Sequence, residues 1–308
     1  MLRVFLLIVV GLAGDPEHGT AFEKWGATLA GSAGRLGVER QNVQLLAEKG
    51  EGDVKPNARA TKEEIQKVFE TFAKTATPDD LVFVTLIGHG SYDGTDAKFN
   101  LPGPDISAKE FGALLRRLPT RQVVFVDTSS SSGPFIEELS GPGRTIVTAT
   151  RNGAERYATL FGGFFVEALT SDTADADKNK RVSVLEAFKY AKGEVTRAYE
   201  REGLLATEHA LLDDNGDKQG SPDPQPTTAD GKIASALAIG STDAATPLPT
   251  DPKLRALILE QRDLERRVEA LRLLKDSMEP ARYQSELERL VTELALKTRE
   301  LRTLQAPR

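Results

Sequence analysis

Cysteine is absent from the 308-residue chain, which excludes disulfides, zinc–thiolate sites and any thiol nucleophile. The absence leaves the compartment open, because a cysteine-free chain suits a reducing or an oxidising environment. Charge of one sign is not in large excess either, since 40 basic and 46 acidic residues give a net charge of -6. The charge balance therefore predicts no preference for nucleic acid or for an anionic membrane surface.

Long apolar runs are also scarce. The N-terminal run, with Val4–Val10 at its centre, is too short to span a bilayer. It is either a buried first strand that ends at Gly11 or the apolar part of a signal peptide. We favour the strand, because Gly14, Asp15 and Pro16 are typical of a strand-to-helix connection. We accordingly expect a soluble protein, cytoplasmic by default, with export to a periplasm as the alternative.

The first 200 residues alternate apolar strands with amphipathic helices. The expected strands are 4–10, 42–46, 81–87, 122–126 and 145–149, and the expected helices are 21–36, 61–74, 107–118, 159–169 and 184–199. Strict alternation implies an α/β domain with a mostly parallel sheet and helices on both faces. The runs LVFVTLI and VVFV lack polar alternation, which is typical of central strands.

The composition divides the chain into three parts. Residues 1–212 form the expected α/β domain, and residues 213–252 form a linker rich in proline, glycine and aspartate, in which 233–239 has the pattern of an edge strand. Residues 253–308 are heptad-like, with a break at Met278-Glu279-Pro280 that predicts two helices. These helices form either an antiparallel hairpin on their own domain or a coiled coil between chains, which would make the protein a homo-oligomer.

Two strand ends carry residues suited to chemistry. The first reads IGHG, with His89 between Gly88 and Gly90, and the second reads VVFVDTSSSSG. Functional groups collect at the carboxyl ends of strands in a parallel sheet. The small residues on either side of His89 would let a substrate backbone approach, and the amide of Gly90 is a candidate donor to an oxyanion.

These two motifs, in this order, resemble those of the caspase/legumain-like (clan CD) cysteine peptidases. In that family an apolar strand ends in His-Gly, and a later strand ends in an acidic residue, Ala, Cys, any residue, Ser and Gly. Counting back from the closing Ser-Gly places Ser130 at the cysteine, whereas counting forward from Asp127 places Ser129 there. The resemblance covers residues 1 to 200 and implies a caspase-like fold in which His89 and one serine occupy the dyad positions.

The missing cysteine decides what the resemblance implies for function. A serine hydroxyl needs a closely coupled base, which a cysteine thiolate does not. We therefore expect a pseudopeptidase that binds a protein or peptide ligand as a regulatory scaffold. The alternatives are a hydrolase with a Ser-His dyad and a Cys-to-Ser form of a cysteine endopeptidase. In such families a pocket beside the dyad selects a side chain of the substrate, and three residues are candidates to line it for an acidic group: Arg144, Arg151 and Arg156.

One acidic loop has the spacing of a calcium loop. Oxygen ligands fall at positions 1, 3, 5, 7, 9 and 12, which are Asp175, Asp177, Asn179, Arg181 (through its carbonyl), Ser183 and Glu186. Lys180 stands at position 6, where glycine is expected. A second acidic run, residues 213–217, has ligand-like spacing but lacks the distant glutamate. The loop from Asp175 to Glu186 is thus either a calcium site or a solvated acidic loop that caps the next helix, and the resemblance requires no cofactor.

Overall fold

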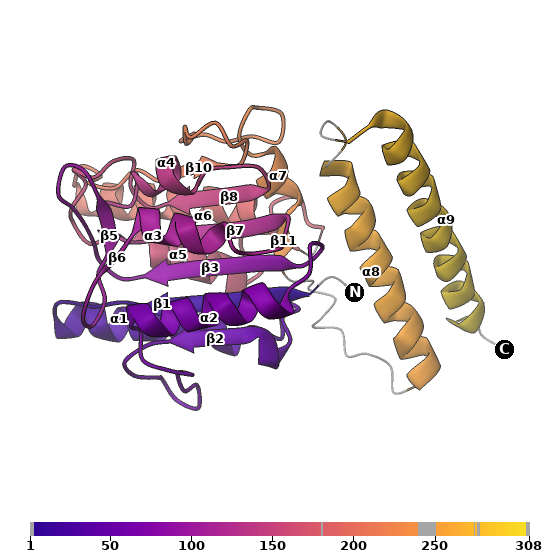
Figure 1. The fold of residues 1–308 in the computed structure, drawn as a ribbon, viewed down its shortest axis with the longest axis horizontal. Helices are drawn as coiled ribbons and strands as arrows, with labels where there is room; N and C mark the ends of the chain where they lie inside the picture. The colour runs from indigo at the N-terminus through magenta and orange to yellow at the C-terminus, as the bar shows by residue number, and fades with distance from the viewer. Residues whose placement is uncertain (1–2, 180, 240–250, 274, 276–277, 306–308) are drawn as a thin grey trace. The chain divides into compact units, whose positions relative to one another are not determined.

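The computed structural model describes residues 3–179, 181–239, 251–273, 275 and 278–305. The chain divides into two compact units, whose described parts are residues 3–239 and residues 251–305. The first unit is an α/β domain and the second is helical (Figure 1).

A six-stranded sheet forms the centre of the first unit, in the order β10-β8-β7-β3-β1-β2. Its strands are β1 (Val4–Val10), β2 (Val43–Leu46), β3 (Leu81–Ile87), β7 (Gln122–Asp127), β8 (Arg144–Thr148) and β10 (Leu211–Asp213). Neighbouring strands are parallel except for β10, which is antiparallel to β8. Every residue of β1 and β3 is buried, which explains why their sequences lack polar alternation.

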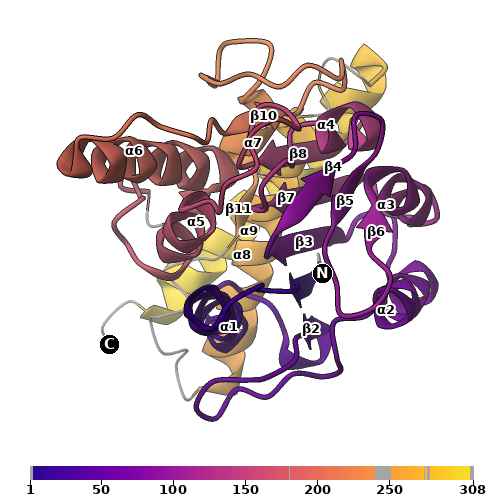
Figure 2. The same ribbon diagram turned by 90° about the vertical axis from the view of Figure 1, so that its left-hand side faces the viewer.

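Helices cover both faces of this sheet (Figure 2). On one face lie α1 (Pro16–Gly31), α5 (Phe161–Thr170) and α6 (Val184–Glu202). On the other lie α2 (Lys62–Thr75), α3 (Ala108–Leu115) and α4 (Phe135–Leu139). The expected α/β class with a mostly parallel sheet, consistent with a caspase-like fold, is thereby confirmed.

Two small sheets lie outside the main one. Strands β4 (Gly90–Tyr92), β5 (Ala97–Phe99) and β6 (Ile106–Ser107) form an antiparallel sheet directly after β3. Strands β9 (Val182–Ser183) and β11 (Ala238–Ile239) form an antiparallel pair. The first small sheet matters for the site because β4 begins at Gly90.

Helix α1 and residues 233–239 differ from the sequence-based expectation. Helix α1 begins at Pro16 rather than at residue 21, because the Asp15 carboxylate accepts bonds from the amides of Glu17 and His18 and proline suits the first helical position. Residues 233–239, expected as an edge strand, form helix α7 (Lys232–Ala236) followed by β11. Strand β11 pairs with β9 and not with the six-stranded sheet.

The second unit contains α8 (Pro252–Leu273) and α9 (Pro280–Gln305). Pro280 begins α9, as the break in the heptads predicts, and the Glu279 carboxylate caps the first turn through the amides of Ala281 and Arg282. The helices share an apolar cluster formed by Leu264, Val268, Leu271 and Leu290, with Met278, Tyr283, Leu287 and Leu294 at its edge. Lys297 on α9 pairs with Glu260 on α8 at 2.5 Å.

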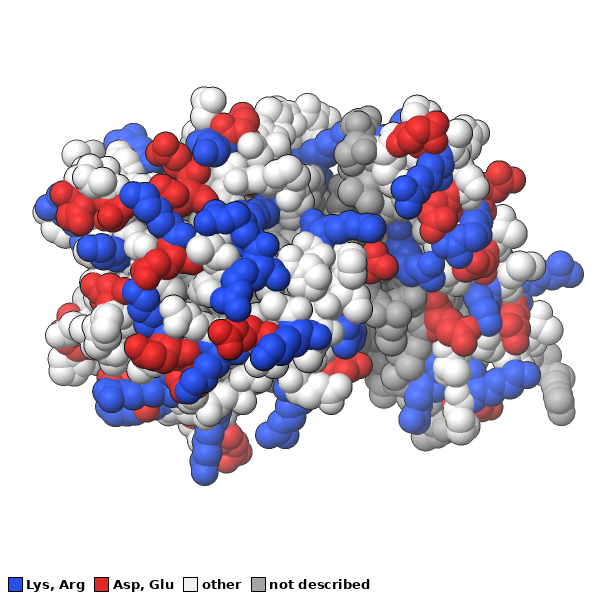
Figure 3. Space-filling view, viewed as in Figure 1, with Lys and Arg blue, Asp and Glu red and all other residues white. Residues whose placement is uncertain are grey.

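Acidic and basic side chains are interspersed over the face of the α/β domain that carries α2 and α3 (Figure 3). Arg117 pairs there with Glu70 at 3.7 Å, and Lys62 pairs with Glu110.

Among the described residues, no helix is long and apolar enough to cross a membrane.

Candidate functional site

The two motifs lie side by side at the carboxyl edge of the sheet. Residues 88–90, the histidine turn, follow β3, and residues 127–133, the serine turn, begin at the last residue of β7. The two strands are parallel neighbours, with Leu86 paired to Asp127. On the other side of β3, β1 ends at the same level, since Val10 pairs with Ile87. The segment after β1 therefore borders the histidine turn as well.

His89 is half-buried and bonded to the segment after β1. Its Nε2 lies 2.8 Å from the carbonyl oxygen of Ala13. Because a carbonyl only accepts hydrogen bonds, Nε2 carries the proton and Nδ1 is the basic nitrogen of the neutral ring. Burial lowers the pKa of His89, and the bond to Ala13 opposes this effect only in part. The ring is therefore neutral near pH 7.

Two side chains of α1 pack against the histidine ring. The rings of His18 and Phe22 lie 5.1 and 5.2 Å from that of His89, both edge-to-face. Asp15, which caps α1, contacts Nδ1 of His18 at 2.6 Å. The amide of His18, and then its ring, lower the pKa of Asp15. The sequence signal for the group formed by Asp15, His18 and Phe22 was that one of the chain's three histidines, His18, comes soon after β1.

Ser129 is bonded to the carboxylate of Asp127 and not to the histidine. Its hydroxyl donates to Asp127 Oδ1 at 2.6 Å, and its amide donates to the same oxygen at 2.9 Å. Both residues are fully buried. Burial raises the pKa of Asp127 to about 6, against the lowering effect of the Ser129 bonds. In the sequence, Asp127 served only to align the serine run with the family motif, and its role as the hydrogen-bond partner of Ser129 was not predicted.

Ser130 is bonded to the backbone of Gly90. Its hydroxyl donates to the Gly90 carbonyl at 3.1 Å and accepts from the Gly90 amide at 3.2 Å. Only glycine fits there, because a Cβ at position 90 would lie 2.3 Å from the Ser130 carbonyl oxygen and 2.7 Å from the Ser129 hydroxyl. The histidine and serine turns are thus packed directly against each other.

The rest of the serine turn is fixed by the segment after β8. Ser131 has a φ of 56°, which is uncommon for a residue other than glycine. Its amide donates to the carbonyl of Glu155 at 2.8 Å and its hydroxyl to the carbonyl of Gly153 at 3.1 Å. The Glu155 carboxylate in turn accepts from the amide of His209 at 3.1 Å and contacts its Nδ1 at 2.7 Å. Neither Glu155 nor His209 was expected from the sequence, because their partners are distant in the chain.

The geometry brings the dyad candidates close together without coupling them. Ser129, Ser130, Gly90 and His89 all lie in the two adjoining turns, as the sequence predicts. Within the part of the chain that the structure describes, neither serine hydroxyl makes a hydrogen bond to His89. The Ser-His coupling that would activate a serine nucleophile is therefore not formed.

The three arginines expected near a substrate pocket lie in different places. Arg144 begins β8 and pairs with Val123, so it lies at the amino edge of the sheet, opposite the two turns. It donates to the carbonyl of Leu139 at 2.8 Å. Arg151 follows β8 on the side of the turns and is bonded to Glu155 at 3.0 Å, and Arg156 is exposed. Position alone leaves Arg151 and Arg156 as pocket candidates.

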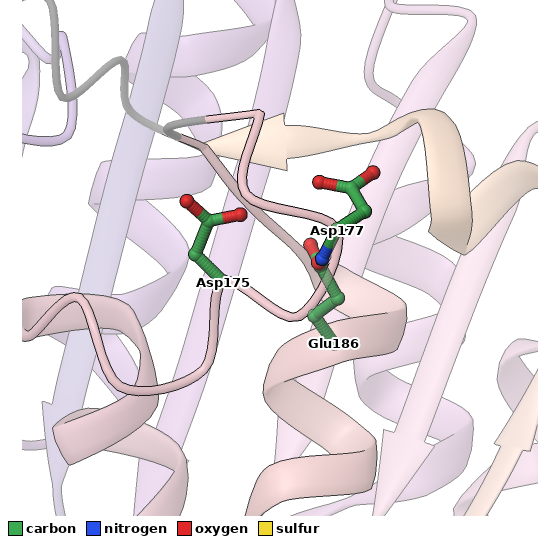
Figure 4. Close-up of side chains that lie close together, drawn as sticks. All are labelled: Asp175, Asp177 and Glu186. Carbon is green, nitrogen blue, oxygen red and sulfur yellow. The ribbon is translucent and has the colours of Figure 1, made fainter.

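The predicted calcium loop forms a compact turn between α5 and α6. Asp175, Asp177 and Glu186 each bring one carboxylate oxygen to within 4.8 Å of the others (Figure 4). The amide of Asn179 donates to Oδ1 of Asp175 at 3.1 Å and to Oδ1 of Asp177 at 3.0 Å. Lys180, the departure from the loop pattern, lies outside the described residues.

The oxygens of this loop suit a hard cation, but Glu186 already has several donors. Its Oε1 accepts from the amide of Ala176 at 3.0 Å, and its Oε2 accepts from the Ser183 amide and hydroxyl, both at 2.8 Å. The amide of Arg181 donates to the side chain of Asn179 at 2.8 Å. A cation in this loop would share the Glu186 oxygens with these donors.

Comparison with known proteins gives one family. Residues 60–211 match the model of the Peptidase C13 family, a range that contains both turns. This match confirms the legumain-like resemblance of the motifs. The crystal structure of protein GSU0716 from Geobacter sulfurreducens is similar at 16% identity with a TM-score of 0.46, over 72% of this chain and 95% of that one. No curated protein matches the chain.

Proposed function

Because residues 60–211 match the model of the Peptidase C13 family, we propose that this domain is a pseudopeptidase that binds a protein or peptide ligand without cleaving it. The observation that carries the proposal is the bonding of the two serines. The Ser129 hydroxyl donates a hydrogen bond to the Asp127 carboxylate. The Ser130 hydroxyl makes two hydrogen bonds, both to the backbone of Gly90. The Ser129 hydroxyl thus stabilises the serine turn internally, and the Ser130 hydroxyl joins this turn to the histidine turn.

The bond between Gly90 and Ser130 also occupies the amide that would stabilise the oxyanion during hydrolysis. Acyl transfer depends on amide donors aimed at the developing oxyanion. The Gly90 amide, the candidate donor, is directed to the Ser130 hydroxyl at 3.2 Å. A substrate carbonyl would have to displace this hydroxyl before the amide could act on it. The chain has no thiol nucleophile, and the Gly90 amide is already bonded to Ser130. Both features favour a domain that does not cleave peptides.

Exposed apolar side chains near the two turns favour a protein or peptide ligand. Leu12, next to the His89 partner Ala13, is 43% exposed, and Tyr157 and Leu160 are 73% and 41% exposed. Residue Thr159, beside Leu160, donates to the carbonyl of Thr128 at the start of the serine turn. These three side chains offer a ligand apolar contacts on segments that adjoin the two turns.

A fluorophosphonate probe and a broad peptide library test the proposal on the full-length protein. We expect labelling and turnover no higher than those of His89→Ala, because neither serine hydroxyl is bonded to His89. Labelling that is present in the parent and disappears in both Ser130→Ala and His89→Ala would establish the alternative, a hydrolase with a Ser-His dyad. Binding of library peptides without cleavage supports the scaffold function.

A cysteine introduced at position 129 or 130 tests which of the two serines occupies the position of the family's cysteine. Ser129→Cys and Ser130→Cys each introduce the single cysteine of the chain, and iodoacetamide titration against pH reports the thiol pKa. We expect the thiol in the family's catalytic register to react faster than that of the other variant. Thiol-dependent peptide cleavage by either variant would show that the remaining site is still competent, as in a Cys-to-Ser form of a cysteine endopeptidase.

We also propose calcium as a ligand of the loop from Asp175 to Glu186, on the strength of its three converging carboxylates. Calorimetric titration with calcium chloride is expected to show one bound ion fewer for Asp175→Ala/Asp177→Ala than for the parent. Asp172→Asn, an exposed neighbour outside the loop, is the matched control and should bind as the parent does. Equal stoichiometry in all three proteins would exclude this loop as a site.

A further inference from the structure

A second loop of acidic residues, 213–219, follows β10 on the antiparallel edge of the sheet. Asp213 ends β10, where it pairs with Ile146 of β8. The loop then packs against the end of α4, since the amide of Lys218 donates to the Ser140 hydroxyl at 3.1 Å and Gly216 adjoins Gly141. The loop therefore connects the edge strand with the helix beside it.

Asp213 carries a buried oxygen that nothing in the described chain satisfies. The residue has no exposed surface. Its Oδ1 accepts from the amide of Gly216 at 3.0 Å, so the carboxylate is directed into the loop. Its Oδ2 is also buried, and no donor among the described residues reaches it. Leaving a buried carboxylate oxygen without a partner is costly, and such a group in a native structure calls for a water or an ion.

Neighbouring carboxylates make this cost larger. Asp214 follows Asp213 in the chain, and its amide donates to the carboxylate of Asp230; both residues are buried. Asp217 lies in the loop itself. Asp214 caps α7 through the amides of Gly231 and Ala234. None of these four carboxylates forms an ion pair with a lysine or arginine in the described parts of the chain. Like charges gathered without a counter-charge repel one another.

We propose that residues 213–219 form a calcium site built around the unpaired Oδ2 of Asp213. The other ligands are the side-chain oxygens of Asn215 and Asp217 and the carbonyl of Gln219, at every second position along the loop. Carboxylate, carboxamide and carbonyl oxygens are the donors that calcium prefers. The turn also has the shape that such spacing requires, with positive φ at Gly216 (82°) and Lys218 (69°).

The ion supplies the missing counter-charge, and it stabilises the sheet edge by tying β10 to the loop. Binding of this kind stabilises the folded state in proportion to the ion's affinity, because the unfolded chain has no such site. The site is independent of the peptidase-like turns and of the loop from Asp175 to Glu186, so its test does not depend on either proposal.

Thermal melts of the chelator-treated full-length protein, with and without calcium, test the site. At calcium far above the dissociation constant we expect the parent to melt roughly 5 °C higher or more. Asn215→Ala/Asp217→Ala removes two exposed ligands and is expected to lose the part of this shift that comes from the loop, together with one bound ion by calorimetry. Asp223→Asn, an exposed aspartate outside the loop, is the control and should retain both.

A second variant distinguishes an ion ligand from a merely structural residue. Asp213→Asn keeps the shape and removes the unpaired charge, so it should melt at or above the parent temperature in chelator and below it in calcium. Asp175→Ala/Asp177→Ala is measured in parallel and should retain the shift due to residues 213–219. The proposal is overturned if Asn215→Ala/Asp217→Ala binds as many ions and shifts as far as Asp223→Asn.

Discussion

Truncation of Phe125 to alanine is expected to lower the free energy of unfolding by about 3–5 kcal/mol. Phe125 lies in the middle of β7 and has no exposed surface. Its ring meets that of Phe111 at 5.1 Å, edge-to-face, and that of Phe135 at 6.4 Å. A cavity at this point is bordered by β7, α3 and α4 at once, and these elements have little room to collapse into it.

Chemical denaturation measures the effect, and Phe164→Ala is the matched control. Phe164 lies on α5 and is only partly buried, so its truncation should cost less than half as much. Equal costs for the two variants would show that the cluster around Phe125 is not the main support of β7. A large loss at position 125 would also explain how the serine turn, at the end of β7, is fixed in place.

The sequence predicted the sheet well because the strands that carry the site are buried on both faces. The apolar runs that became β1, β3 and β7 have no polar residue to interrupt them, apart from Thr85. The order of His-Gly and the serine run along the chain was then enough to place the two turns side by side, because parallel neighbours end at the same edge.

Contacts between distant segments were not predictable in the same way. The bond from His89 to Ala13 spans 76 positions, and the one from His209 to Glu155 spans 54. Nothing local in the chain marks Glu155 as a partner of the serine turn or of His209. Residues 233–239 were mistaken for an edge strand because a short apolar piece fits a buried helix equally well. There, the buried Asp214 caps the helix through the amides of Gly231 and Ala234, a bond that only the fold creates.

The stability of the domain is expected to depend on pH through Asp127, in the sense opposite to that of an exposed carboxylate. Burial raises the folded-state pKa of Asp127 from 3.8 to about 6. Its contribution to stability is therefore complete below the unfolded-state pKa and is lost as the pH rises through 6. A difference of this size corresponds to roughly 2–3 kcal/mol between pH 4 and pH 8.

Asp127→Asn isolates this contribution, because an amide keeps the acceptor for Ser129 but does not titrate. Urea denaturation at pH 4, 6 and 8 should show the variant gaining stability relative to the parent, by roughly 2–3 kcal/mol over that interval. Asp93→Asn is the control: amides of Asp96 and Thr95 lower the pKa of this exposed residue, so its small contribution changes in the other direction. Parallel curves for the parent and Asp127→Asn would contradict the prediction. The predicted divergence would show that the carboxylate that accepts the Ser129 hydrogen bond is buried in the folded domain and ionises near pH 6.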